Sequence, residues 1–181
     1  SEEIDFTNVS GKDKKIYWNA KKNEIAEICK RFHLDFQRNK FEHVSVFAIG
    51  PIPLLMYLGS HLDNTIQTKF FPLHRDGSRM WYKGSAKAKY SFRLVRENKS
   101  QDGVALLISL SGFVQTEAIP EEVLKNYTIY ELFLDPQPNY NFLRTEKDLL
   151  NFQQEYTNSL SKIQNLHKNL KEISIFPAIP A

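Results

Sequence analysis

The fold is decided by residues 43–59, which read His43-Val44-Ser45-Val46-Phe47-Ala48-Ile49-Gly50-Pro51-Ile52-Pro53-Leu54-Leu55-Met56-Tyr57-Leu58-Gly59. Residues 43–49 are apolar enough for a buried strand, and residues 54–58 have helical character and end at a glycine. A tight loop joins the two elements. In open α/β sheets this loop is where ligands bind, because free backbone N–H groups at a helix start attract anions. A rigid connector without a ligand is the alternative interpretation, since two prolines remove N–H donors.

Similar patterns along the chain predict the other elements. Apolar residues at three- and four-residue steps predict a helix at residues 18–33 with Cys29 in its core-facing stripe. A Thr-x-x-Asp box starting at Thr145 predicts a second long helix, and Pro120 followed by two glutamates predicts a short one. Strands are expected at residues 66–73, 89–96, 104–110, 127–134 and 173–176. Several of these are apolar on both faces, which suits a sheet covered by helices on both sides, so the fold class is α/β.

Composition limits the class of protein. The 181 residues fit one domain, and 41% hydrophobic with 25% charged residues exclude a disordered chain. The longest apolar stretch, residues 44–59, is interrupted by Gly and Pro and is shorter than the roughly 20 residues of a membrane span. The acidic N-terminus does not resemble a signal peptide, and the single Cys29 suits a reducing compartment. We therefore expect a cytoplasmic protein without membrane contact.

Signatures of catalysis and metal binding are missing from the sequence. It contains no His-Glu-x-x-His, no Gly-x-Ser-x-Gly, no Walker loop and no Gly-x-Gly-x-x-Gly motif. The five histidines are scattered without a second ligand at zinc spacing. We therefore expect no catalytic residue, no metal site and no cofactor.

Positive charge is concentrated in residues 74–89. Five basic residues stand there against the single acidic Asp76, so this segment carries +4 in a chain of net charge +3. Such a basic loop favours a small anionic ligand over an extended nucleic-acid surface. Arginine can pair with phosphate, and aromatic rings can stack on bases, so this loop is a candidate nucleotide-binding segment. The alternative interpretation is a solvated basic loop whose Trp81 packs into the core. Hydroxyl donors follow the strand at residues 104–110, in the segment Ser109-Leu110-Ser111-Gly112.

A short internal similarity relates two parts of the chain. Residues 46–54 align with residues 173–181, so that Ile52-Pro53 matches Ile179-Pro180 at an offset of 127 residues. In both copies Ile-Pro follows a predicted strand. The similarity is either chance, because apolar strands that end in proline are common, or a true repeat whose second copy stops where its helix should begin.

The order of these motifs resembles a SAVED domain over nearly the whole chain. The matching segments are His43 to Leu55 with Leu58-Gly59, His74-Arg75, Trp81, Ile108 to Gly112, and Ile175 to Pro180, and the approach through Ile4-Asp5-Phe6 and Trp18 is also similar. The resemblance implies two fused Rossmann-like (CARF-like) lobes that form one sensor domain, residues 1–181. The first lobe would cover about residues 1–140, and a bridging helix and the start of a pseudo-symmetric second lobe about residues 141–181. A full domain continues further, so we expect a C-terminal truncation, with the effector absent.

The resemblance also implies a function in bacterial antiphage defence of the CBASS type. A SAVED sensor binds a cyclic oligonucleotide, a cyclic di- or trinucleotide made by a partner nucleotidyltransferase. Binding drives self-association and activates a fused or associated effector, such as a nuclease, a TIR domain or a protease, of which a DNA endonuclease is expected here. The sensor itself is then no enzyme and does not bind DNA directly.

Carried onto this chain, the resemblance implies fourteen ligand-binding candidates. They are Pro51, Ile52, Pro53 and Leu54; His74, Arg75, Trp81 and Lys83; Ser109 and Ser111; and Phe176, Pro177, Ala178 and Pro180. Arg75 and Lys83 would neutralise phosphates, Trp81 would stack on a base, and the two proline loops would shape the cleft. Two alternatives stay open, a ring-cleaving phosphodiesterase of CARF type that uses His74 and a general nucleic-acid adaptor that uses the basic loop.

Overall fold

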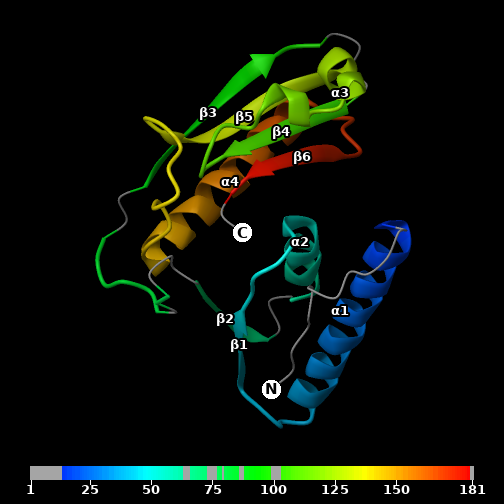
Figure 1. The fold of residues 1–181 in the computed structure, drawn as a ribbon, viewed down its shortest axis with the longest axis vertical. Helices are drawn as coiled ribbons and strands as arrows, with labels where there is room; N and C mark the ends of the chain where they lie inside the picture. The colour runs from blue at the N-terminus through cyan, green and yellow to red at the C-terminus, as the bar shows by residue number, and fades with distance from the viewer. Residues whose placement is uncertain are drawn as a thin grey trace. The chain divides into compact units, whose positions relative to one another are not determined.

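The computed structural model describes residues 14–62, 66–72, 77–78, 80–85, 88–98 and 103–179. The chain divides into two compact units, one up to Met80 together with Ala181, and one from Trp81 to Pro180. The first contains the order α1-β1-α2-β2, and the second contains β3-β4-η1-α3-β5-α4-β6 (Figure 1). Both units mix helices with strands, which confirms the α/β class.

The first unit packs two helices around a small core. Helix α1 (Lys14–Gln37) includes the predicted helix and extends it at both ends, and α2 (Ile52–His61) follows the proline loop. Ile25, Cys29 and Leu54 form the buried cluster between them. Cys29 is 2% exposed, and burial raises the pKa of its thiol. The prediction that Cys29 is a core residue is therefore confirmed.

The first unit also holds a two-stranded parallel sheet. Strand β1 (His43–Phe47) pairs with β2 (Gln67–Phe71) from His43 opposite Gln67 to Phe47 opposite Phe71. The rings of Phe47 and Phe71 stack with their centroids 4.8 Å apart. The predicted succession of strand, tight loop and helix is confirmed, with a strand that ends two residues before the expected Ile49. The prediction that this strand is buried is wrong, because β1 belongs to a two-stranded sheet, its residues alternate between exposed and half-buried, and Phe47 is 57% exposed.

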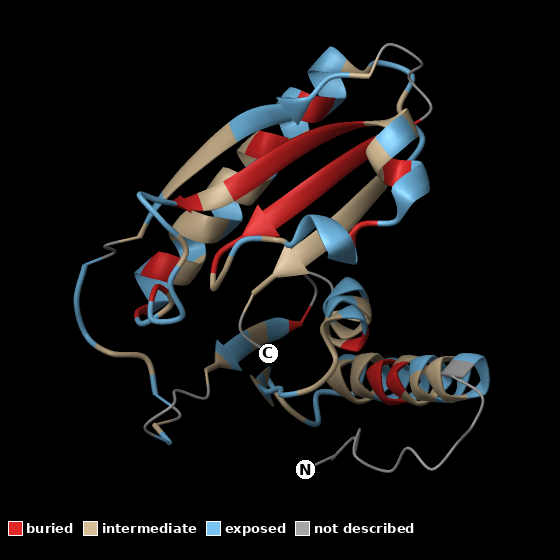
Figure 2. Cartoon of the chain, turned by 45° about the horizontal axis from the view of Figure 1, so that its top comes forward, coloured by how far each residue is buried: buried red, intermediate tan, exposed pale blue. Residues whose placement is uncertain are grey.

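The second unit is built on a four-stranded sheet of order β3-β5-β4-β6. Its strands are β3 (Lys89–Arg96), β4 (Gly103–Ser109), β5 (Tyr127–Asp135) and β6 (Ile173–Ala178). Strands β4, β5 and β6 are mutually parallel, whereas β3 runs antiparallel to β5. Every residue of β4 is buried, as its apolar sequence predicts for a central strand (Figure 2).

Helices cover both faces of this sheet, as predicted. Helix α4 (Glu146–Leu166) contributes Ile163 to a core with Leu106 and Leu132, whereas α3 (Glu121–Asn126) contributes Val123 to a core with Ala105. The 3-10 turn η1 (Thr116–Ala118) precedes α3. The chain crosses from β4 to β5 through α3 and returns through α4 to β6 on the other side of β4. This reversal, with crossover helices on opposite faces, is the doubly wound Rossmann-like arrangement.

Of the helices that the structure describes, none combines the length and the apolar character that crossing a bilayer requires.

Candidate ligand-binding site

The carboxyl ends of β4, β5 and β6 meet at one edge of the second sheet. Ser109 at the end of β4 lies opposite Ala178 of β6 on one side and opposite Phe133 of β5 on the other. Open α/β sheets place their ligands outside this edge, next to the point where the winding reverses. A ligand is therefore expected at these three strand ends.

The turn after β4 holds the end of β6. The backbone N–H groups of Leu110 and Ser111 donate to the carbonyl oxygen of Ala178 at 3.1 and 3.0 Å. The Ser111 hydroxyl donates to the same oxygen at 3.1 Å, across 67 residues of sequence. The structure thus brings together two predicted site residues, Ser111 and Ala178, through bonds within the protein.

Ser109 lies beneath this turn and is fully buried. Its hydroxyl donates to Glu131 Oε1 at 2.7 Å and accepts the backbone N–H of Val114 at 3.1 Å. Both hydrogen-bonding roles of the hydroxyl are used inside the protein, so Ser109 supports the carboxyl edge from below.

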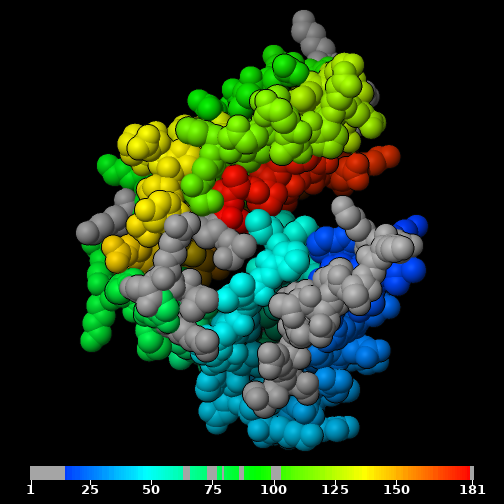
Figure 3. All heavy atoms as spheres, in the orientation of Figure 1, coloured from blue at the N-terminus to red at the C-terminus, as the bar shows by residue number. Residues whose placement is uncertain are grey.

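Phe176 and Pro177 lie within β6, opposite Leu107 and Ile108. Phe176 packs against the core beneath α3, and both residues are half-buried. Proline is accommodated here because β6 stands at the end of the strand order, where it makes a ladder to one neighbour only. Figure 3 shows part of β6, in red, at the surface.

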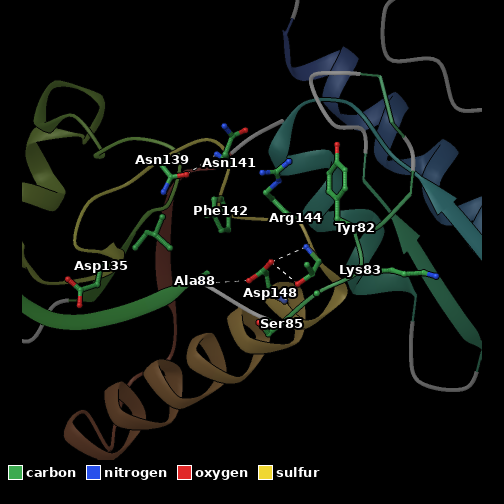
Figure 4. A pocket seen from close by; sticks show the side chains of 13 residues that line it. Tyr82, Lys83, Ser85, Ala88, Asp135, Asn139, Asn141, Phe142, Arg144 and Asp148 are labelled. Carbon is green, nitrogen blue, oxygen red and sulfur yellow. Dashed lines mark hydrogen bonds between the residues drawn. The ribbon is translucent and has the colours of Figure 1, made fainter.

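A cavity of about 450 Å³ opens at the same edge, next to the start of α4 (Figure 4). Its walls come from the segment before β3, from the end of β5, and from the connection that leads into α4. Of the predicted site residues, Lys83 lines this cavity. Eight further polar residues of the lining were not predicted as site residues, namely Tyr82, Ser85, Asp135, Asn139, Asn141, Arg144, Thr145 and Asp148.

Arg144 and Tyr82 form a stacked pair in this cavity. The guanidinium carbon lies 4.7 Å from the centre of the Tyr82 ring, and the Tyr82 N–H donates to the Arg144 carbonyl at 3.0 Å. Arg144 and Lys83 are both exposed, and within the described part of the chain neither forms an ion pair. Two cations without an ion pair among the described residues, beside a flat ring, suit an anionic ligand that also carries a planar group. The exposed carboxylate of Asp135 lines the same cavity.

Two amide side chains add hydrogen-bonding capacity. Asn139 and Asn141 are exposed in the connection after β5. The Asn139 side-chain oxygen accepts the N–H of Asn141 at 3.0 Å, and the Asn139 N–H donates to the Leu110 carbonyl at 2.9 Å. In the part of the chain that the structure describes, the Asn139 amide nitrogen and the Asn141 amide have no partner, so they are available to a ligand.

The floor of the cavity is the N-terminus of α4, where the predicted capping box is confirmed. The Thr145 hydroxyl accepts the Asp148 N–H at 3.1 Å, and Asp148 Oδ2 accepts the Thr145 N–H at 2.9 Å. The other carboxylate oxygen of Asp148 accepts the N–H of Ala88 at 3.3 Å, and the Asn151 amide donates to the Ala88 carbonyl at 2.7 Å. Asp148 is 2% exposed, so its carboxylate ties the segment before β3 to the helix.

The proline loop of the first unit offers little to an anion. Pro51 and Pro53 have no N–H, and the N–H groups of Leu54 and Leu55 both donate to the Pro51 carbonyl. Within the described residues the Ile52 N–H has no backbone acceptor, and the Leu54 side chain is buried.

The remaining candidates divide between described and undescribed positions. Trp81 is half-buried at the start of the second unit, next to Tyr82. His74, Arg75 and Pro180 lie outside the described residues. Among the residues that are described, no group of three His, Cys, Asp or Glu side chains is placed to hold a metal ion.

A comparison with protein families identifies one match. The family model for SAVED, described as the SMODS-associated and fused to various effectors sensor domain, matches residues 27–181. This match covers most of the chain and confirms the resemblance. The family's description is that of a sensor fused to effectors. A search of curated proteins found no match to the chain.

Proposed function

Since this chain belongs to the SAVED family of sensor domains, we propose that it binds a cyclic oligonucleotide, a cyclic di- or trinucleotide made by a partner nucleotidyltransferase. Binding would drive self-association and activate a fused or associated effector in antiphage defence. The observation that carries the proposal is the cavity at the carboxyl end of β5, where two cations that form no ion pair within the described residues adjoin an aromatic ring and two amides.

Each of these groups suits one part of a nucleotide ring. Arg144 presents a planar fork that pairs with two phosphate oxygens, and Lys83 adds a mobile charge. The ring of Tyr82 orients the guanidinium and offers an edge to a base. The amides of Asn139 and Asn141 supply both donors and acceptors, which a base edge or a ribose hydroxyl requires.

The proposed activity is binding without chemistry. Of the two carboxylates that line the cavity, Asp135 is exposed at the end of β5. The carboxylate of Asp148 is buried and already accepts hydrogen bonds from Thr145 and Ala88. It is thus occupied as a structural group, and the proposal needs neither a general base nor a cofactor. The candidates that rest on the family resemblance, including His74, Arg75, Trp81 and the two proline loops, stay proposed ligand contacts.

The test is calorimetric titration with cyclic di-AMP, cyclic di-GMP, cyclic GMP–AMP and cyclic tri-AMP, each beside its linear counterpart. We expect one ring to bind tightly and its linear form to bind at least about tenfold more weakly, because preorganisation lowers the entropic cost of binding. Light scattering on the same samples reports self-association. If no ring binds better than its linear form, the proposed function is wrong.

Arg144→Ala identifies the cavity as the place of binding. Loss of a bidentate phosphate contact should weaken binding by about tenfold or more. Lys147→Ala is the matched control, because Lys147 is an exposed cation in the first turn of α4 that does not line the cavity. Equal losses in the two variants would show general charge attraction instead. A steep fall of affinity with salt would favour the adaptor, since few phosphates give a shallow dependence.

A further inference from the structure

A buried carboxylate lies in the middle of the second sheet. Glu131 of β5 is 4% exposed, and glutamate is almost never this buried unless it is paired. Its direct neighbour on the antiparallel strand β3 is Arg93, which donates to Oε2 through Nε at 2.9 Å and Nη2 at 2.6 Å. Its other oxygen accepts the Ser109 hydroxyl of β4 at 2.7 Å. A row of three polar side chains thus crosses three strands of an otherwise apolar layer.

One end of this row is at the surface and the other is buried. The side chain of Arg93 is 56% exposed, and its guanidinium carbon lies 4.8 Å from the centre of the Phe133 ring. The Phe133 ring contacts the face of the guanidinium, and Glu131 accepts hydrogen bonds from its edge, so the guanidinium is held in both directions. The position of the Glu131 carboxylate is thereby set from two sides, by Arg93 and by the strand that carries it.

The buried end of the row leads to the cavity through the turn after β4. The Ser109 hydroxyl, held by Glu131, accepts the Val114 N–H and so closes the segment 110–114 on itself. Within this segment the Leu110 carbonyl accepts the N–H of Asn139, a residue of the cavity wall. The carboxylate of Glu131 is therefore connected to the cavity by consecutive hydrogen bonds and a short turn.

We propose that Glu131 is a positioning residue for ligand recognition, which acts through Ser109 on the 110–114 turn and thereby on Asn139. The proposal rests on the proposed function of the cavity. The physical reason is directional: an apolar side chain at position 131 would fill the same space, but it would leave the Ser109 hydroxyl free to rotate. With the carboxylate present, the Ser109 proton points to Glu131 and a lone pair points to the Val114 N–H.

The first test is amide hydrogen exchange of the full chain. In Ser109→Ala the Val114 N–H loses its acceptor, so its exchange should become about tenfold faster, and Asn139 should follow. Ser159→Ala is the matched control, because Ser159 is a buried residue of α4 whose hydroxyl donates to the Glu155 carbonyl within the same helix. Unchanged exchange at Val114 and Asn139 in Ser109→Ala would overturn the proposal, whether or not the protein binds a ring.

The second test measures affinity for the ring among cyclic di-AMP, cyclic di-GMP, cyclic GMP–AMP and cyclic tri-AMP that the wild-type chain binds. Glu131→Gln and Ser109→Ala should each weaken binding by about tenfold, and the double variant should lose no more than either single variant, since one residue acts through the other. Additive losses would overturn the positioning role. Failure of every ring to bind the wild type refutes the proposed function alone, because the exchange measurement still decides whether the Ser109 hydroxyl, which Glu131 orients, holds the turn.

Discussion

Replacement of Thr145 by alanine tests how the cavity floor is held. Its hydroxyl caps α4 by accepting the Asp148 N–H at 3.1 Å, and it also donates to Asp148 Oδ2 at 2.7 Å. Thr145 is 7% exposed, so water does not readily replace the lost group. The alanine variant therefore removes a helix cap and one of the donors to a buried carboxylate at the same time.

The magnitude follows from these two losses. An N-cap threonine contributes about 1 kcal/mol to the free energy of unfolding. A buried carboxylate that loses one donor costs about another 1–2 kcal/mol, reduced here because Asp148 keeps the N–H groups of Thr145 and Ala88. We expect a loss of about 2–3 kcal/mol, which for a chain of this size lowers Tm by about 4–12 °C.

The assay is urea unfolding followed by tryptophan fluorescence. The chain has two tryptophans, Trp18 in the first unit and Trp81 in the second, so a Trp18→Phe background reports on the second unit alone. Thr145→Ser should retain most of the stability because it keeps the hydroxyl. Thr157→Ala, at an exposed position of the same helix, should change it by less than about 0.5 kcal/mol. A loss at Thr145 no larger than at Thr157 would refute the reasoning.

Two other substitutions probe the sheet and its core. In Gly103→Ala a Cβ atom would lie 2.5 Å from the Tyr127 ring, so the ring must shift, and we expect a loss of about 1–3 kcal/mol in urea unfolding; a neutral result would mean that the ring yields freely. Burial, with the negative charges of Asp148 and Glu155, raises the pKa of Tyr90, so its neutral form is favoured in the folded protein. This stabilisation is complete below about pH 10 and is lost as pH rises through the folded-state pKa, so the free energy of unfolding should fall at high pH, and less steeply in Tyr90→Phe. Identical slopes above pH 10 would contradict the assignment.

Local patterns predicted most elements of this fold. The capping box at Thr145 requires residues that are three apart, and the apolar run at residues 104–108 is long enough for a central strand, so both signals lie within one element. Bounds differ where tertiary contacts extend or shorten an element. The first helix, for example, begins at Lys14 and not at residue 18.

Long-range pairing was beyond the reach of these patterns. The sequence of β5 shows a polar residue, Glu131, within an apolar strand, but its partners Arg93 and Ser109 are 38 residues before it and 22 residues before it in the chain. Which residue stands beside it depends on strand order and register, and a shift of one residue would turn every side chain to the opposite face. The antiparallel direction of β3 was likewise not predicted.

The candidate site was predicted in part for the same reason. Ligands bind at the carboxyl ends of parallel strands, so the predicted strand that ends at Leu110 indicates Ser111 as a site residue. By the same rule, the predicted strand that ends at Leu134 indicates the connection that holds Asn139 and Asn141. Arg144 directly precedes the predicted helix cap, a position where an exposed cation has no periodic signal of its own.

Motif residues and recognition residues therefore have separate tasks under the proposed function. Ser109, Ser111 and Ala178 belong to the segments that resemble the family. Ser111 donates to Ala178, and Ser109 bonds to Glu131 and Val114, so these hydrogen bonds stabilise the sheet edge itself. Arg144 and Asn141 lie in a connection outside those segments, and their side chains are exposed in the cavity. Because a connecting segment can change without disturbing the sheet beneath it, such residues can alter which ring is bound while the motif residues preserve the edge that presents it.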